Sequence, residues 1–228
     1  MSLIMVLSTP KAIVLAAESR MTYKLAIDNS IVKYEDNKEM KLYWFEEYNV
    51  GIAHCGNARM FSDKGSACVN IALMWFGIRK LNKGDTAKSI ADKLNKYIKE
   101  IEHIGTHFFI VGFENEIPQV YRVNSKGVEL VNKNNVYGCW IDGICNTFDV
   151  ADVYGEMDVK EAIEFAEAYF ENILSKRDDE SLQPEEKDVL KTCGGFVDIL
   201  VIGGNESYWV KNKALSENKN ILVSTDTN

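Results

Sequence analysis

The sequence predicts an α+β protein, a four-layer αββα sandwich in which helices flank two stacked, mainly antiparallel β-sheets. Strand-like apolar runs dominate the first sixty residues, two helical stripes follow, and later strands and helices lead to a strong final strand. Each sheet in such a fold needs one face on its partner and the other under helices, so two stacked sheets satisfy this order. The length of 228 residues, with 46% hydrophobic and 26% charged residues, suits one globular domain.

The chain opens with strands. Residues 3–7 and 12–17 are continuous apolar runs, and the turn-forming sequence Ser-Thr-Pro-Lys at 8–11 separates them. A strand that is covered on both faces need not alternate, so we expect a buried hairpin here. Residues 41–45 and 49–55 predict a second pair of strands.

Helices and strands then follow each other. Residues 58–79 carry apolar side chains near helical spacing and predict one helix, and a second apolar stripe runs from after Gly84 to near Gly105. Asp158 and Glu161 precede a third helical stripe and are spaced as in a capping box. Further strands are predicted at residues 108–113, 119–123 and 136–140.

The last third of the chain ends the domain. Residues 176–191 are rich in charge and predict an exposed loop, whereas residues 196–202 and 208–210 predict two strands. We therefore expect a single domain over residues 1–211 and a polar C-terminal tail over residues 212–228.

Composition excludes several classes of function. The formal net charge of −8 argues against nucleic acid, whose phosphates an acidic surface repels. No apolar span is long enough to cross a bilayer, and the N-terminus lacks the features of a signal peptide. The cysteines form no C-x-x-C pair and predict reduced thiols in the cytoplasm. They are Cys55, Cys68, Cys139, Cys145 and Cys193.

The histidines give no sequence signal for a metal or a cofactor. His54 and Cys55 are neighbours on a predicted strand, so their side chains should point to opposite faces and cannot act as base and nucleophile together. His103 and His107 flank a turn, and the sequence around them lacks further ligands. We therefore expect no metal site and no cofactor.

Four segments resemble a known family. Residues 12–22, AIVLAAESRMT, resemble the second strand of proteasome β subunits and of the bacterial HslV-type peptidase, which are N-terminal-nucleophile (Ntn) hydrolases. Residues 40–42, 51–58 and 193–202 resemble the strand with the catalytic lysine, the strand that runs into Gly, and the late Gly-Gly-x-x-Asp strand. The resemblance keeps one order over residues 2–210, and each motif alone is weak.

The resemblance implies a catalytic set. Ser2, exposed by removal of Met1, aligns with the nucleophile, and its α-amine, which titrates near neutrality, is the base. Lys41 resembles the catalytic lysine, which lowers the pKa of the nucleophile, and Glu18 resembles the acid that holds it. The backbone N–H of Ala53 is expected to stabilise the oxyanion.

Several positions depart from the family pattern. Cys193 and Leu190 replace a serine near the late Gly-Gly and an aspartate three residues before it. Asp142 replaces a serine in a glycine-rich loop, and Ala53 stands where the family has the oxyanion glycine. These replacements alter residues of the family's catalytic pattern, so they affect the expected proton transfer at the α-amine and not the expected fold.

Three hypotheses about function follow. The first is a serine- or threonine-type peptidase that hydrolyses peptides or unfolded protein inside a homo-oligomeric ring, with an ATPase as a further partner. The second is a catalytically silent structural subunit in which Lys41 and Glu18 are an inherited ion pair. The third is an amidase for small amides on the same fold.

Overall fold

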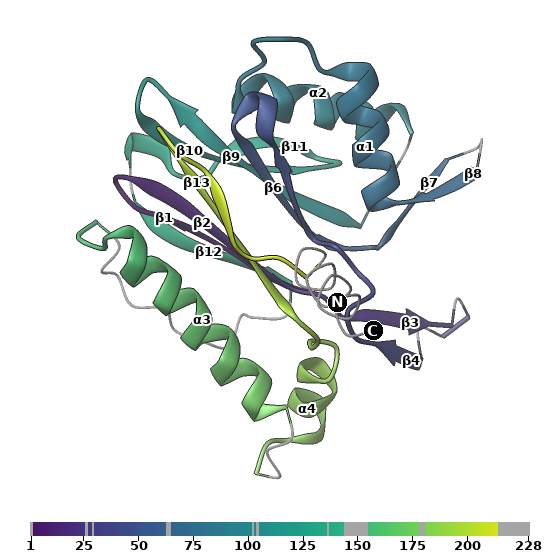
Figure 1. Ribbon diagram of the computed structural model, residues 1–228. Coiled ribbons are helices and arrows are strands. Elements are labelled where there is room, and N and C mark those ends of the chain that lie inside the picture. Colours follow the sequence, from purple (N-terminus) through teal and green to yellow (C-terminus); the bar gives the residue numbers. More distant parts are fainter. Residues whose placement is uncertain are drawn as a thin grey trace, which may run out of the picture.

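The computed structural model describes residues 2–25, 27–28, 30–62, 65–101, 103, 105–135, 137–143, 155–177 and 181–213. Within these ranges, the strands form two five-stranded antiparallel sheets and two separate hairpins (Figure 1). The first sheet has the order β12-β1-β2-β13-β14 and consists of β1 (Leu3–Ser8), β2 (Ala12–Glu18), β12 (Gly138–Gly143), β13 (Val197–Gly203) and β14 (Tyr208–Lys211). The second sheet has the order β11-β10-β9-β6-β5 and consists of β5 (Leu42–Phe45), β6 (Val50–Gly56), β9 (Thr106–Glu114), β10 (Ile117–Asn124) and β11 (Gly127–Leu130). The predicted α+β class with antiparallel sheets is confirmed.

The hairpins and helices complete the described structure. The hairpins are β3 (Met21–Lys24) with β4 (Ile31–Glu35), and β7 (Arg59–Ser62) with β8 (Gly65–Cys68). The helices are α1 (Val69–Lys80), α2 (Ala87–Glu100), α3 (Val159–Lys176) and α4 (Pro184–Leu190). In Figure 1, α1 and α2 cover one sheet, α3 covers the other, and both hairpins project from the same end of the molecule.

Three apolar cores explain the continuous apolar runs at the start of the chain. Every residue of β1 and β2 is buried. Alternate side chains of β1 face either the helices or the other sheet: Leu3, Met5 and Leu7 pack with α3, whereas Ile4 and Val6 pack with the second sheet. The outer face of the second sheet packs against α1 and α2. A strand buried on both faces needs no polar alternation.

The predicted capping box begins α3. The Asp158 carboxylate accepts a hydrogen bond from the Glu161 N–H at 2.9 Å, and the Glu161 carboxylate accepts one from the Asp158 N–H at 2.8 Å. These two contacts satisfy two N–H groups that have no partner within the helix.

The helix predicted over residues 58–79 is shorter than expected. The chain first forms the β7–β8 hairpin, and α1 begins only at Val69. Gly65 lies within the predicted helix, and glycine costs about 1 kcal/mol relative to alanine in a helix interior. The apolar spacing is helical only from Cys68 onward.

The predicted loop over residues 176–191 also contains a helix. Proline is compatible with the first position of a helix, because the N–H that it lacks would have no partner there. α4 accordingly begins at Pro184, and its last residue, Leu190, is buried beside α3. The many charged residues of this segment are the reason that the sequence predicted an exposed loop.

Two further predictions meet the limits of the described residues. Among the described helices, none has the length and apolar character needed to cross a bilayer. Asn212 and Lys213 are the described part of the predicted tail over residues 212–228, and Cys145 lies outside the described ranges. The predicted single domain over residues 1–211 stays a prediction.

Candidate functional site

Lys41 and Glu18 form a buried ion pair between the two sheets. Glu18 ends β2 of the first sheet, and Lys41 directly precedes β5 of the second. Their residues are only 1% and 2% exposed. The Lys41 ammonium donates to Glu18 Oε1 and, at 3.0 Å, to the Arg20 carbonyl. Since a buried lysine is costly without a partner, this pair explains how Lys41 is retained in the core.

The Glu18 carboxylate is also held by three backbone N–H groups. Leu3 N–H donates to Oε1 at 3.1 Å, while the N–H groups of Arg20 and Gly194 donate to Oε2 at 2.7 and 3.2 Å. These three hydrogen bonds fix the position of the carboxylate. Because Lys41 and Leu3 share Oε1, the ammonium lies beside the start of β1.

Ser2 directly precedes β1 and is buried. Its carbonyl lies so close to Gly143 of β12 that a Cβ on that glycine would meet it at 1.5 Å. The register places Leu3 opposite Gly143 and Ile4 opposite Asp142. The structure therefore brings three of the sequence-predicted residues, Ser2, Glu18 and Lys41, to one end of the sheets.

Ala53 does not join this group directly. It lies inside β6, opposite Leu42 of β5 and Phe109 of β9. His54 N–H donates to the Lys41 carbonyl at 3.0 Å. Since consecutive N–H groups of a strand point to opposite sides, the Ala53 N–H points toward β9 and away from Lys41. By the same alternation, the N–H of Gly56, the last residue of β6, points to the Lys41 side, and the sequence analysis missed this glycine.

A second buried group lies behind Lys41, on the face of β6 that is covered by helices. His54 stacks on Tyr43, with ring centroids 5.8 Å apart, and its Nε2 lies 3.7 Å from Glu39 Oε1. Burial raises the pKa of Glu39 to about 7 and lowers the pKa of His54 to about 3. Cys55 points instead into the core between the sheets, so the two neighbours lie on opposite faces as predicted.

The departures from the family pattern fall into two places. Cys193 and Leu190 are buried in the core beside α3. Asp142 faces the second sheet, where its Oδ2 lies 3.2 Å from His107 Nδ1, and it interacts with Cys55. Burial first, and then Asp142, raise the pKa of the Cys55 thiol. These three residues are distant in sequence, which is why sequence analysis did not bring them together.

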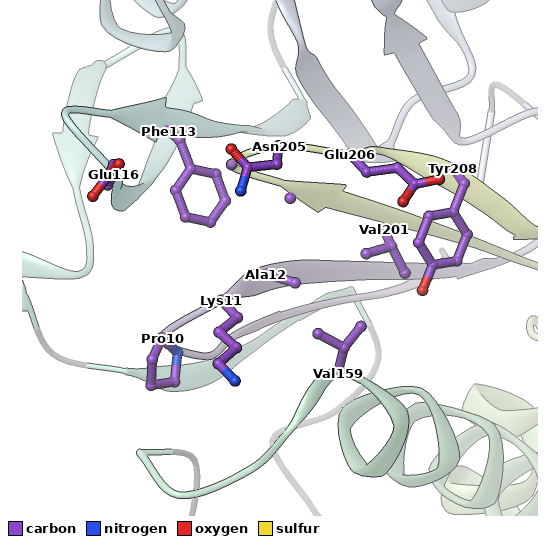
Figure 2. Close-up of a pocket in the computed structure, with 12 residues that line it drawn as sticks. Pro10, Lys11, Ala12, Phe113, Glu116, Val159, Val201, Asn205, Glu206 and Tyr208 are labelled. Atoms are coloured by element: carbon purple, nitrogen blue, oxygen red, sulfur yellow. The ribbon is translucent and has the colours of Figure 1, made fainter.

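A large cavity lies at the other end of the molecule. It has a volume of about 660 Å³ and lies where the β1–β2 turn meets the β13–β14 turn. Figure 2 shows Lys11 and Val159 on one side of it and Phe113, Asn205 and Tyr208 on the other. One strand length, roughly 20 Å for six residues, separates this cavity from Ser2. It is not part of the candidate catalytic group.

The fold and this buried pair define an α+β protein of antiparallel sheets with a buried lysine–glutamate pair at one sheet end. Among solved structures, the chain is similar to the Anbu (Gly-1) mutant from Hyphomicrobium sp. strain MC1. The TM-score is 0.60 and the sequence identity 12%, over 99% of this chain and 94% of the other. At this identity the similarity shows the fold alone. No protein-family model and no curated protein matches the chain.

These comparisons correct the family assignment. The motifs resembled proteasome β subunits and the HslV-type peptidase, but no family model matches, and a solved structure to which the chain is similar is that of an Anbu protein. The assignment to that family is therefore wrong. The physical reason lies in the motifs: apolar strands, glycines at tight approaches and a buried Lys41–Glu18 pair belong to the arrangement of the two sheets. Such features identify a fold and do not separate the families that share it.

Proposed function

We propose that this protein is an N-terminal-nucleophile hydrolase that cleaves peptide bonds. One observation carries the proposal: the buried Lys41 ammonium shares a carboxylate oxygen of Glu18 with the N–H of Leu3, the residue that follows Ser2. A positive charge at this place favours an ionised nucleophile at the start of β1.

The chemistry starts with the removal of Met1, which would free the α-amine of Ser2. That amine takes the proton of the Ser2 hydroxyl, and the oxygen attacks the carbonyl carbon of the substrate amide. The amine then gives the proton to the leaving nitrogen as the C–N bond breaks. A water molecule, deprotonated by the same amine, then attacks the ester that remains on Ser2. The C–O bond to Ser2 breaks, the acid product leaves, and the amine returns the proton to the Ser2 oxygen.

A backbone N–H at the end of β6 would stabilise the tetrahedral oxyanion. The sequence analysis assigned this role to Ala53. The alternation of N–H groups along β6 favours Gly56, which is also exposed and lies at the sheet end. We therefore include both in the proposal and favour Gly56.

The proposal extends to architecture and assembly. The three cores, which lie between helices and sheet, between sheet and sheet, and again between sheet and helices, support the αββα sandwich of Ntn hydrolases. The exposed apolar side chains of α1 support self-association into a ring, in which peptides or unfolded protein would reach the site. A cytoplasmic location and an ATPase partner are parts of the same proposal, and the reduced thiols of Cys55, Cys68 and Cys139 support the location.

A silent structural subunit is the second candidate, and a specific observation favours it. Leu190 and Cys193 stand in the apolar core where the family pattern has polar residues that assist the amine. In that case the Lys41–Glu18 pair would contribute only to the fold. An amidase for small amides is the third candidate.

The experiment compares variants of protein that starts at its natural codon. Intact mass gives the state of Met1, and an electrophile specific for N-terminal hydroxyls labels Ser2 if the amine is free. We expect cleavage of fluorogenic peptides whose kcat falls by about 100-fold or more in Lys41→Ala and in Ser2→Ala. The control is Lys38→Ala, which removes an exposed lysine three residues away.

The outcomes separate the candidates. Unchanged peptide hydrolysis in Lys41→Ala would refute the assignment of the site. Retained Met1, no labelling and no hydrolysis would establish the silent subunit. Hydrolysis of small amides alone would establish the amidase.

A further inference from the structure

Three side chains from three strands meet beside the candidate site without a role in it. Cys55 comes from β6, His107 from β9 and Asp142 from β12. Their sulfur, nitrogen and oxygen atoms all lie within 4.8 Å of one another. Among these atoms, His107 Nδ1 and Asp142 Oδ2 lie within hydrogen-bond distance, 3.2 Å apart.

The sheet register causes this convergence. Cys55 and His107 stand directly opposite each other on neighbouring strands, so their side chains share one face. That face meets the first sheet, whose edge strand β12 carries Asp142. Cys55 is buried, whereas the His107 side chain is 47% exposed, so the group opens to solvent on the histidine side.

We propose that Cys55, His107 and Asp142 bind one divalent transition-metal cation of the zinc type. Thiolate, imidazole and carboxylate together are ligands that Zn²⁺ and Co²⁺ accept, while Mg²⁺ and Ca²⁺ require oxygen ligands. Three protein ligands leave the fourth tetrahedral position for water. Binding transfers the thiol proton of Cys55 to solvent, so each metal bound releases one proton.

The distances fit this geometry with small movements. Tetrahedral bonds of about 2.0–2.3 Å place ligand atoms roughly 3.3–3.8 Å apart. The separation of His107 and Asp142 is already near this value, and the 4.8 Å limit on the group leaves about 1 Å for the remaining ligand to close.

Neighbouring groups limit the affinity. Arg122 Nε lies 3.8 Å from the same Oδ2 of Asp142, and the positive charge of Lys41 acts to lower the pKa of the Cys55 thiol. Asp142 Oδ1 accepts the Gly143 N–H at 2.8 Å, which leaves Oδ2 for the metal. The guanidinium repels a cation, so removal of its charge should strengthen binding. A network that merely ties the sheets together by hydrogen bonds would show no such response.

The test is a Co²⁺ titration of the full chain without a histidine tag. We expect one Co²⁺ per chain, with a thiolate-to-metal charge-transfer band and the intense visible bands of a tetrahedral site, and displacement by Zn²⁺. Calorimetry in two buffers of different ionisation enthalpy should give about one proton released per metal.

Matched variants decide which side chains bind. His107→Ala, Asp142→Asn and Cys55→Ser should each weaken Co²⁺ binding by about 100-fold or more. Even the loss of a residue that only hydrogen-bonds to a metal ligand lowers metal affinity by about 10- to 100-fold. Arg122→Gln should strengthen it by roughly three- to tenfold. The control is Cys139→Ser, which removes a thiol on the other face of β12 and should leave binding unchanged.

Substoichiometric binding without a charge-transfer band, or binding that survives Cys55→Ser, would overturn the proposal. His107→Ala keeps the test decisive if the buried variants do not fold, because the side chain is half-exposed. Far-UV circular dichroism checks the fold of every variant. None of these readouts requires peptidase activity.

Discussion

At the scale of single residues, Glu18 joins the two sheets through one carboxylate. It accepts hydrogen bonds from Lys41 on one sheet and from the N–H groups of Leu3, Arg20 and Gly194 around its own. A buried ion pair adds little when compared with an apolar replacement, yet the loss of one partner leaves an uncompensated charge. The two ions therefore depend on each other.

Lys41→Met should lower the free energy of unfolding by about 3–5 kcal/mol, because Glu18 becomes a buried carboxylate without a cation. Urea denaturation measures this change. Adding Glu18→Gln should restore part of the stability, since the amide is neutral and its oxygen still accepts from a backbone N–H. Lys38→Met, at an exposed lysine, should change stability by less than about 0.5 kcal/mol. A similarly small effect of Lys41→Met would contradict the mutual dependence of the two side chains.

Glu39 gives a pH-dependent stability with a defined sign. Burial raises its pKa from 4.5 to about 7. The folded state therefore holds a proton that the unfolded state has lost, so stability is full below pH 4.5 and falls until pH 7. The loss is about 3 kcal/mol. Glu39→Gln should be nearly as stable as the parent at pH 5 and clearly more stable at pH 8, in urea denaturation. The exposed Glu47→Gln should show no such change between the two pH values.

His54 produces the opposite slope. Burial lowers its pKa from 6.5 to about 3, so the unfolded state gains a proton first as the pH falls, and stability decreases below pH 6.5. Between pH 4.5 and 6.5 the two residues largely cancel in the parent. His54→Gln should therefore expose the Glu39 slope, with stability falling as pH rises in this window. A flat profile for His54→Gln would contradict the raised pKa of Glu39.

Residue chemistry was predictable only where it follows a strand pattern. Glu18 and Lys41 could be found because an acid at a strand end and a lysine beside apolar neighbours are unusual in themselves. Cys55, His107 and Asp142 could not, since their meeting depends on strand register and sheet stacking. The spacing of residues in the sequence gives no information on strand register or sheet stacking.

At the scale of elements, the pairing of β1 with β12 positions Ser2. Gly143 has a φ of +112°, and a Cβ there would lie 1.5 Å from the Ser2 carbonyl oxygen. Gly143→Ala should therefore cost more than about 2 kcal/mol and open this end of the pairing. Urea denaturation and hydrogen exchange of the β1 amides measure the two effects. Gly127→Ala is the control, because nothing lies within 4 Å of its added Cβ; equal effects of both variants would contradict the close approach.

The capping box of α3 gives a smaller, local prediction. Asp158→Ala removes the side chain that accepts from Glu161 N–H and should cost about 1 kcal/mol. Urea denaturation detects this loss, and Asp158→Asn should recover most of it. Glu164→Ala, an exposed change on the same helix, is the control. A loss in Glu164→Ala as large as in Asp158→Ala would assign the effect to helix charge and not to the cap.

Secondary-structure elements were predictable where neighbouring residues in the sequence determine them. The α3 cap and the β1–β2 hairpin follow from neighbouring residues, and both form as predicted. The β7–β8 hairpin does not, because apolar residues at helical spacing in residues 58–79 obscured the strand pair. α4 was missed because most of its residues are charged and suggested a loop, although Leu190 at its end is buried.

At the scale of the whole molecule, α1 has an apolar outer face that no described element covers. Its inner side packs on the second sheet, while Ile71, Met74, Trp75 and Ile78 are 45%, 53%, 44% and 68% exposed. An apolar groove of about 660 Å³, lined by Met40 and Trp44 among others, continues this surface. Contiguous apolar surface of this kind is typical of a protein interface.

We therefore expect the protein to sediment as an oligomer that depends on α1. Ile78→Asp places a charge in the interface and should weaken association by about 100-fold or more, because a buried unpaired charge costs several kcal/mol. Sedimentation velocity over a range of concentrations measures the shift toward monomer. Lys96→Glu, on the exposed side of α2, should leave the distribution unchanged. Since the Ile78 side chain is 68% exposed within one chain, Ile78→Asp should fold with the parent's circular dichroism. A parent that is monomeric at all concentrations would contradict the role of α1.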